Sequence, residues 1–139
     1  MAYVMIVDDD VDFATAAAMV LQNSGHEVCI EPDPKLAVAS MEGRRPDLVV
    51  LDVMFPEDPA AGFSVARSMH HFSQALQNVP VLMLTAVNSK FPMGFSKRDI
   101  DELWLPVADF LEKPVDLGVL RDRISLLLRD DSSPSRIGR

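Results

Sequence analysis

The chain alternates short apolar runs with longer segments in which apolar residues recur at helical spacing. The short runs predict five strands, at residues 3–7, 26–30, 48–51 leading into Asp52, 79–84 and 108–112. Helical spacing predicts helices at residues 11–24, about 34–42, from about 61 past 69, 97–103, and from 117 onward. The runs LVVL and VLML lack a period-two alternation, so we expect strands that are buried on both faces.

Capping residues support several of these helix boundaries. Gly25 follows the first helix, and Gly43 follows the second, which opens with Asp33 and Pro34. Asp116 is placed to cap the last helix. The apolar faces of the first and last helices are expected to consist of Phe13, Ala17, Val20 and Leu21, and of Leu117, Leu120, Ile124, Leu127 and Leu128.

The order of these elements indicates an α/β fold. Strands that alternate with helices predict a doubly wound five-stranded parallel sheet flanked by helices on both faces. We expect one domain over residues 1–129, followed by a polar and disordered tail at 130–139. In sheets of this class, ligands bind beyond the carboxyl ends of the strands.

Composition narrows the class of protein. The 139 residues carry a net charge of −8, which argues against a surface that binds nucleic acid, because phosphate backbones require clustered Lys and Arg. No apolar run reaches the length of a membrane span, and the first residues show no signal-peptide pattern. A single cysteine, Cys29, fits a reducing compartment. We therefore expect a cytoplasmic domain without membrane insertion.

Polar residues follow four of the five predicted strands at their carboxyl ends. Asp8, Asp9 and Asp10 follow the first strand, Asp52 closes the third, Thr85 closes the fourth and Lys113 follows the fifth. One parallel sheet brings such residues to a common edge. Carboxylates gathered there repel one another, and Mg²⁺ would relieve the conflict. A carboxylate, a cation, a lysine and a hydroxyl are also the parts that phosphoryl transfer to an aspartate needs.

Four segments resemble the motifs of the response-regulator receiver domain: IVDDD, PDLVVLDVMFP, PVLMLTA and DFLEKPV. The resemblance covers about residues 3–129. It implies a flavodoxin-like, CheY-like fold with strand order 2-1-3-4-5. It also implies a single-domain phosphoacceptor switch of a two-component phosphorelay rather than an enzyme. The implied partners are a histidine kinase or histidine phosphotransfer protein and an output protein.

The resemblance also assigns a phosphorylation site and a metal site. Asp52 is the implied phosphoacceptor and a ligand of Mg²⁺. Asp9 is the implied direct metal ligand, and Asp8 would hold the ion through water. The backbone carbonyl of Met54 would complete the protein ligands. Asp10 belongs to the same acidic run, but its place at the start of a helix, where a negative charge complements the helix dipole, explains it without a role at the metal.

Two further roles concern the response to phosphorylation. Thr85 would bind a phosphoryl oxygen, and Lys113 would pair with the phosphate. Phe110 matches the switch aromatic of the family, although a core position explains a phenylalanine there equally well.

The chain departs from the family pattern in two loops. The segment after Asp52 is longer than usual, and residues 87–106 replace the usual loop and fourth helix. We expect residues 87–106 to carry the output specificity. Met54 and Val87, which stand two positions after Asp52 and Thr85, cannot orient a water molecule, so the phosphorylated state is expected to be long-lived.

Two other functions compete with this interpretation. A phosphatase of the haloacid-dehalogenase type also uses an aspartate nucleophile at a strand end. It needs a second aspartate two residues later, where this chain has Met54. A receiver-like binding module that works without phosphorylation is the other alternative, and the altered loop leaves it open.

Overall fold

The computed structural model describes residues 2–52, 61–86 and 109–132. Its elements in chain order are β1 Tyr3–Val7, α1 Val11–Asn23, β2 Glu27–Glu31, α2 Pro34–Gly43, β3 Leu48–Asp52, α3 Ala61–Phe72, β4 Val81–Ala86, β5 Asp109–Lys113 and α5 Leu117–Ser132. The helix expected at 97–103 lies outside the described residues. Within the described part of the chain, no helix is both long enough and apolar enough to cross a membrane.

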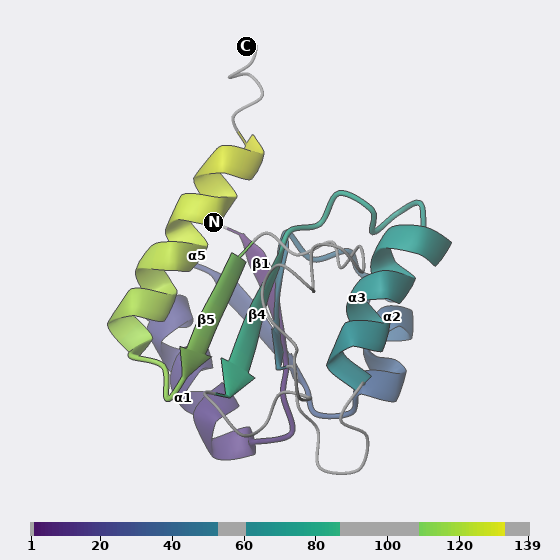
Figure 1. Cartoon of the computed structure of the whole chain (residues 1–139). Coiled ribbons are helices and arrows are strands. Elements are labelled where there is room, and N and C mark those ends of the chain that lie inside the picture. The colour runs from purple at the N-terminus through teal and green to yellow at the C-terminus, as the bar shows by residue number, and fades with distance from the viewer. Residues whose placement is uncertain (1, 53–60, 87–108, 133–139) are drawn as a thin grey trace.

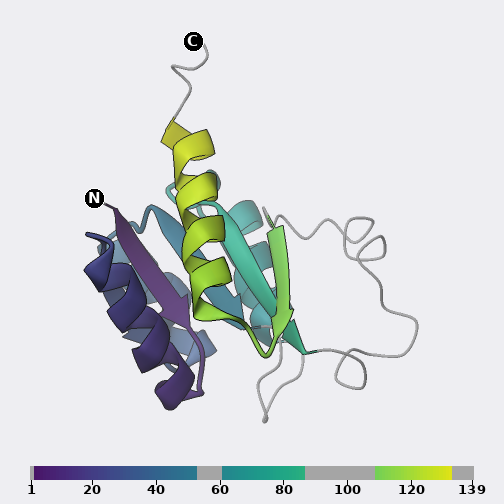
Figure 2. The same cartoon turned by 90° about the vertical axis from the view of Figure 1, so that its left-hand side faces the viewer.

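The five strands form one parallel sheet in the order β2-β1-β3-β4-β5. Helices α1 and α5 cover one face of this sheet, and α2 and α3 cover the other (Figure 1; Figure 2). The doubly wound α/β fold and the strand order 2-1-3-4-5 are therefore confirmed. In this arrangement the carboxyl ends of all the strands meet at one edge of the sheet (Figure 1).

The core consists of two apolar layers, one on each face of the sheet. Consecutive residues of the central strands alternate between the layers, because side chains along a strand point to opposite faces. The layer under α2 and α3 takes Met5, Val7, Val49, Leu51, Val81 and Met83. The layer under α1 and α5 takes Val4, Ile6, Leu48, Val50, Leu82 and Leu84. Burial on both faces explains why these strands are apolar without interruption.

The two expected aspartate caps are present, whereas Gly43, which was expected to follow the second helix, is its last residue. The Asp33 side chain accepts a hydrogen bond from the Lys35 N–H at 2.9 Å, and Pro34 occupies the first turn of α2. The Asp116 Oδ1 accepts from the N–H groups of Gly118 at 2.8 Å and Val119 at 3.1 Å. Such caps satisfy backbone donors that have no partner inside the helix.

Several boundaries differ from the sequence expectation by one to three residues; β2, for example, spans Glu27–Glu31 instead of 26–30. Strand β4 begins at Val81 instead of 79, because Val79 is still in a turn and donates its N–H to the Leu76 carbonyl at 3.2 Å. Strand β5 ends with Lys113, which pairs with Ala86 and therefore belongs to the strand that it was expected to follow. Helix α5 continues to residue 132, so residues 130–132 of the expected tail are helical. The rest of that tail lies outside the described residues.

Candidate functional site

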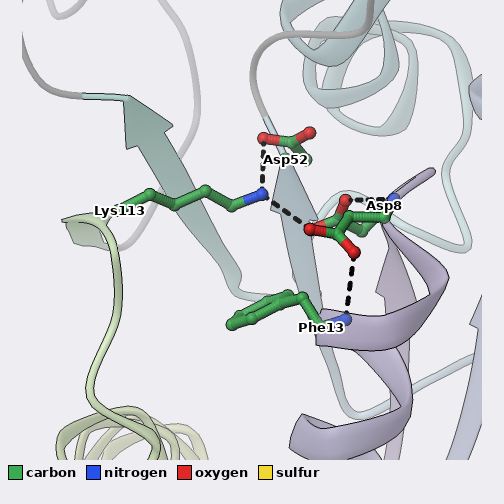
Figure 3. A network of polar contacts seen from close by, with 5 residues as sticks. Asp8, Phe13, Asp52 and Lys113 are labelled. Atoms are coloured by element: carbon green, nitrogen blue, oxygen red, sulfur yellow. Dashed lines mark hydrogen bonds and ion pairs between the residues drawn. The ribbon is translucent and has the colours of Figure 1, made fainter.

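Strand register brings the sequence-predicted aspartates together. Val7 of β1 pairs with Leu51 of β3, so the next residues along the two strands are Asp8 and Asp52. Strand β5 reaches the same edge through the pairing of Ala86 with Lys113. Three strands that are far apart in the sequence therefore deliver two carboxylates and an ammonium group to one place (Figure 3).

Asp8 is the most buried charged residue of this site. Its side chain is 0% exposed. Its Oδ1 accepts a hydrogen bond from the Asp10 N–H at 2.9 Å, and its Oδ2 lies 3.0 Å from the Lys113 Nζ. Burial raises the pKa of the Asp8 carboxyl, while the Asp10 N–H and the Lys113 charge act in the opposite direction. A carboxylate in this position needs positive charge close to it.

Lys113 bridges the two buried carboxylates. Its Nζ lies 3.4 Å from the Asp52 Oδ1 in addition to its contact with Asp8 (Figure 3). Burial acts to lower the pKa of Lys113, but the charges of Asp52 and Asp8 outweigh it, and the pKa is raised. The ammonium group is therefore charged and held beside Asp52, as an electrostatic partner of a phosphoryl group would need to be.

Asp9 completes a cluster that fits a divalent cation. Single carboxylate oxygens of Asp8, Asp9 and Asp52 all lie within 4.8 Å of one another. Asp8 and Asp52 are buried, whereas Asp9 is exposed. Three carboxylates offer hard oxygen ligands, and Asp9 leaves a side open to water, which suits Mg²⁺ because this ion keeps several waters. The residues present therefore fit the expected ion.

Other residues predicted for the site are described only in part. Thr85 lies in β4 and pairs with Glu112 of the neighbouring strand, and Phe110 lies in β5 and pairs with Met83. These pairings place the backbone of each residue, and the switch roles of the two side chains stay predictions. Met54 and residues 87–106 lie outside the described residues.

Two residues of the first helical turn complete the described site. Asp10 is the N-cap of α1 and accepts a hydrogen bond from the Phe13 N–H at 3.1 Å, which agrees with its expected role at a helix start. The Phe13 ring lies beside the Lys113 ammonium, with 5.0 Å between Nζ and the ring centroid. The apolar spacing of α1 identified Phe13 only as a core residue. The sequence did contain a sign of this contact, since an aromatic residue stands about one helical turn after the aspartates that follow the first strand.

A family model and curated relatives match most of the chain. Residues 4–125 match the model of the response regulator receiver domain. The chain is 33% identical over 132 residues to the transcriptional regulatory protein AfsQ1 of Streptomyces coelicolor, covering 93% of this chain and 52% of that protein. It is 30% identical over 126 residues to the alkaline phosphatase synthesis transcriptional regulatory protein PhoP of Bacillus subtilis, covering 91% and 48%. The chain thus spans about half the length of these two relatives.

Solved structures share the fold. The signal receiver domain of a signal transduction histidine kinase from Syntrophus aciditrophicus is 26% identical with a TM-score of 0.76, covering 94% of this chain and 92% of that one. A CheY-like response regulator receiver domain protein from Methanospirillum hungatei is 20% identical with a TM-score of 0.76, covering 94% and 96%. At that lower identity the likeness concerns the fold alone.

Proposed function

This chain belongs to the response-regulator receiver domain family, and from that premise we propose that it is a phosphoacceptor switch in which Asp52 takes the phosphoryl group. The observation that carries the proposal is the position of Lys113. Its ammonium lies within 3.4 Å of Asp52 and 3.0 Å of Asp8, at the edge of the sheet where Asp9 is open to solvent. The charged groups that phosphoryl transfer needs are therefore gathered around the proposed acceptor.

The proposed reaction forms an acyl phosphate. A carboxylate oxygen of Asp52 attacks the phosphorus, a new P–O bond forms, and the bond between phosphorus and the donor breaks. Lys113 is placed to neutralise a phosphoryl oxygen, and Thr85 is the proposed hydroxyl donor to another. Mg²⁺, when bound, adds positive charge that offsets the negative charge of the phosphoryl oxygens. Asp8, Asp9, Asp52 and the Met54 carbonyl are the residues that we propose hold it.

The proposed donor is a phosphohistidine of a histidine kinase or of a histidine phosphotransfer protein, which places the exchange in the cytoplasm. The proposed consequence is altered binding of an output protein, with Thr85 and Phe110 as the residues that respond. Residues 87–106 are the proposed output segment, because they separate the strand that ends near Thr85 from the strand that carries Phe110.

A binding module that works without phosphorylation is the alternative that the proposal must exclude. The same carboxylates and lysine could persist as a structural ion pair, because a buried Asp8 needs Lys113 whether or not Asp52 is modified. A haloacid-dehalogenase type of phosphatase remains disfavoured by Met54, which cannot donate a proton.

Intact-mass analysis after incubation with acetyl phosphate and Mg²⁺ tests the proposal. We expect the wild-type chain to gain one phosphoryl group and Asp52→Asn to gain none, because the amide keeps the shape but is not an anionic nucleophile. Asp12→Asn is the matched control, since Asp12 is an exposed aspartate of the first turn of α1 outside the carboxylate cluster. A full adduct on Asp52→Asn would place the acceptor elsewhere, and a wild-type chain without any adduct would favour the binding module.

A further inference from the structure

We infer that Phe13 is a positioning residue for Lys113, and that its aromatic ring holds the lysine ammonium in place beside Asp52. This inference deepens the proposed function and rests on it where phosphorylation is concerned. The contact itself is a feature of the fold: the Lys113 Nζ lies 5.0 Å from the centroid of the Phe13 ring (Figure 3). A cation within about 6 Å of a ring centroid is attracted by the negative face of the ring.

The ring is fixed relative to Asp8 by a closed set of contacts. The Asp10 N–H donates to the Asp8 Oδ1 at 2.9 Å, and the Asp10 side chain accepts from the Phe13 N–H at 3.1 Å. The ring of Phe13 then meets Lys113, whose Nζ returns to the Asp8 Oδ2 at 3.0 Å. The turn from β1 into α1 therefore determines the position of the buried carboxylate and of the ring together.

An aromatic ring offers Lys113 a kind of support that a further carboxylate would not. An ammonium group has three N–H donors, and the Lys113 Nζ lies close to one acceptor on Asp8 and one on Asp52. A ring face attracts the whole charge through its quadrupole and does not add negative charge to an acidic site. Phe13 can thus restrain Lys113 without adding an acceptor that would compete with a phosphoryl oxygen for an N–H donor.

The support matters most when the carboxylates change partners. A cation bound by Asp8 and Asp52, or a phosphoryl group on Asp52, competes with Lys113 for the same oxygens. The flexible side chain of Lys113 could then move into solvent. It would lose conformational entropy each time it was ordered again beside Asp52. The Phe13 ring keeps its attraction for the ammonium in both states, because the ring does not contribute to the carboxylate cluster.

The competing explanation is that Phe13 only fills the core. The residue is partly buried and packs against the apolar layer under α1 and α5. If Phe13 only fills the core, its contribution depends on apolar volume and does not depend on the charge of Lys113. A positioning role requires an aromatic ring and the ammonium together, so the two explanations predict different results.

The first measurement is the initial rate of phosphorylation by acetyl phosphate at saturating Mg²⁺. We expect Phe13→Leu to slow it by roughly threefold to tenfold, the range of a half-buried cation–aromatic contact, and Phe13→Tyr to restore it to within about twofold of wild type. Leu21→Val is the matched control, because Leu21 is buried in the same layer of α1 and lies outside the site. An unchanged rate in Phe13→Leu, or equal slowing in Phe13→Tyr, would overturn the inference.

The second measurement does not depend on phosphorylation. A double-mutant cycle of Phe13→Leu and Lys113→Met, measured by denaturant unfolding without Mg²⁺, should give a coupling of roughly threefold to tenfold in the unfolding equilibrium constant. Additive effects would mean that the ring and the ammonium do not support each other, and would overturn the inference. A wild-type chain that takes no phosphoryl group would end the proposed function, and the cycle would still decide whether Phe13 holds Lys113.

Discussion

The ammonium of Lys113 lies 3.0 Å from the Oδ2 of Asp8, although the two residues are 105 positions apart in the sequence. The side chain of Asp8 has no exposed surface. The pair joins the end of β5 to the residue after β1, across the strands between them. Because the charge of Asp8 is buried, it must be compensated from inside the site. Lys113 therefore has a structural role that is separable from its proposed role toward a phosphoryl group.

The first prediction concerns this structural role. Lys113→Met should lower the free energy of unfolding by about 1–3 kcal/mol without Mg²⁺, because it leaves a buried carboxylate without its partner. Adding Asp8→Asn should recover part of the loss, since the amide is neutral. Denaturant unfolding measures both effects, and Lys35→Met on the exposed side of α2 is the control. A loss that Asp8→Asn deepens would argue against the charge pair as its cause.

The second prediction concerns the metal. Mg²⁺ should raise the thermal midpoint of the wild-type chain, because an ion that binds only the folded state stabilises it. In Asp9→Ala a tenfold weaker affinity would reduce that stabilisation by about 1.4 kcal/mol at high Mg²⁺. Asp12→Ala removes the same charge from the first turn of α1 outside the cluster and should keep the wild-type response. An equal response in Asp9→Ala would remove Asp9 from the ligand set.

The third prediction concerns the lifetime of the phosphorylated state. Met54 and Val87, which lie outside the described residues, carry no group that can orient water for attack on the Asp52–phosphorus bond. Val87→Glu and Met54→Asn should each speed dephosphorylation after the phosphodonor is removed. The decay is followed by intact mass, with Val87→Leu as the apolar control. Decay as slow as wild type in both polar variants would contradict the explanation.

The fourth prediction concerns pH. Burial lowers the pKa of His26 below its ordinary value of 6.5, and its Nδ1 accepts a hydrogen bond from the Ala2 N–H at 3.2 Å. As the pH falls, the histidine of the unfolded chain takes up a proton before His26 of the folded chain does. The contribution of His26 to stability is therefore complete above pH 6.5 and is lost as the pH falls from there through the lowered pKa.

Denaturant unfolding between pH 7.5 and pH 5 tests this dependence at roughly the range where histidines titrate. His26→Gln should lose less stability on acidification than the wild-type chain, because glutamine takes up no proton. His70→Gln, which removes an exposed histidine of α3, is the control. An identical pH dependence in wild type and His26→Gln would show that His26 does not contribute.

Several features of this protein depended on residues close together in the sequence, and these could be predicted. The caps at Asp33 and Asp116 are local hydrogen bonds between a side chain and the next backbone N–H groups. The strands could be recognised because burial on both faces leaves uninterrupted apolar runs. The gathering of Asp8, Asp52 and Lys113 at one edge also followed, since parallel strands place their carboxyl ends together.

Other features depended on contacts between distant segments. The bidentate pairing of Arg44 with Glu27, at 2.6 Å for each contact, and the stacking of Arg44 on the Tyr3 ring join residues of different elements. The start of β4 at Val81 depended on a turn bond of Val79 that competes with the strand. An apolar run does not reveal which of its residues will pair with a neighbouring strand, because that is decided by register.

The sequence by itself determined which residues reach the carboxyl edge of the sheet, because the period of the apolar pattern identifies each element and the alternation of strands with helices makes the strands parallel. Only the tertiary structure decided how those residues meet there. Lys113 lies between Asp8 and Asp52 with the Phe13 ring beside it, and this depends on strand register and on the position of α1 over the sheet. Such placements are fixed by packing among distant elements, which no local pattern of residues encodes.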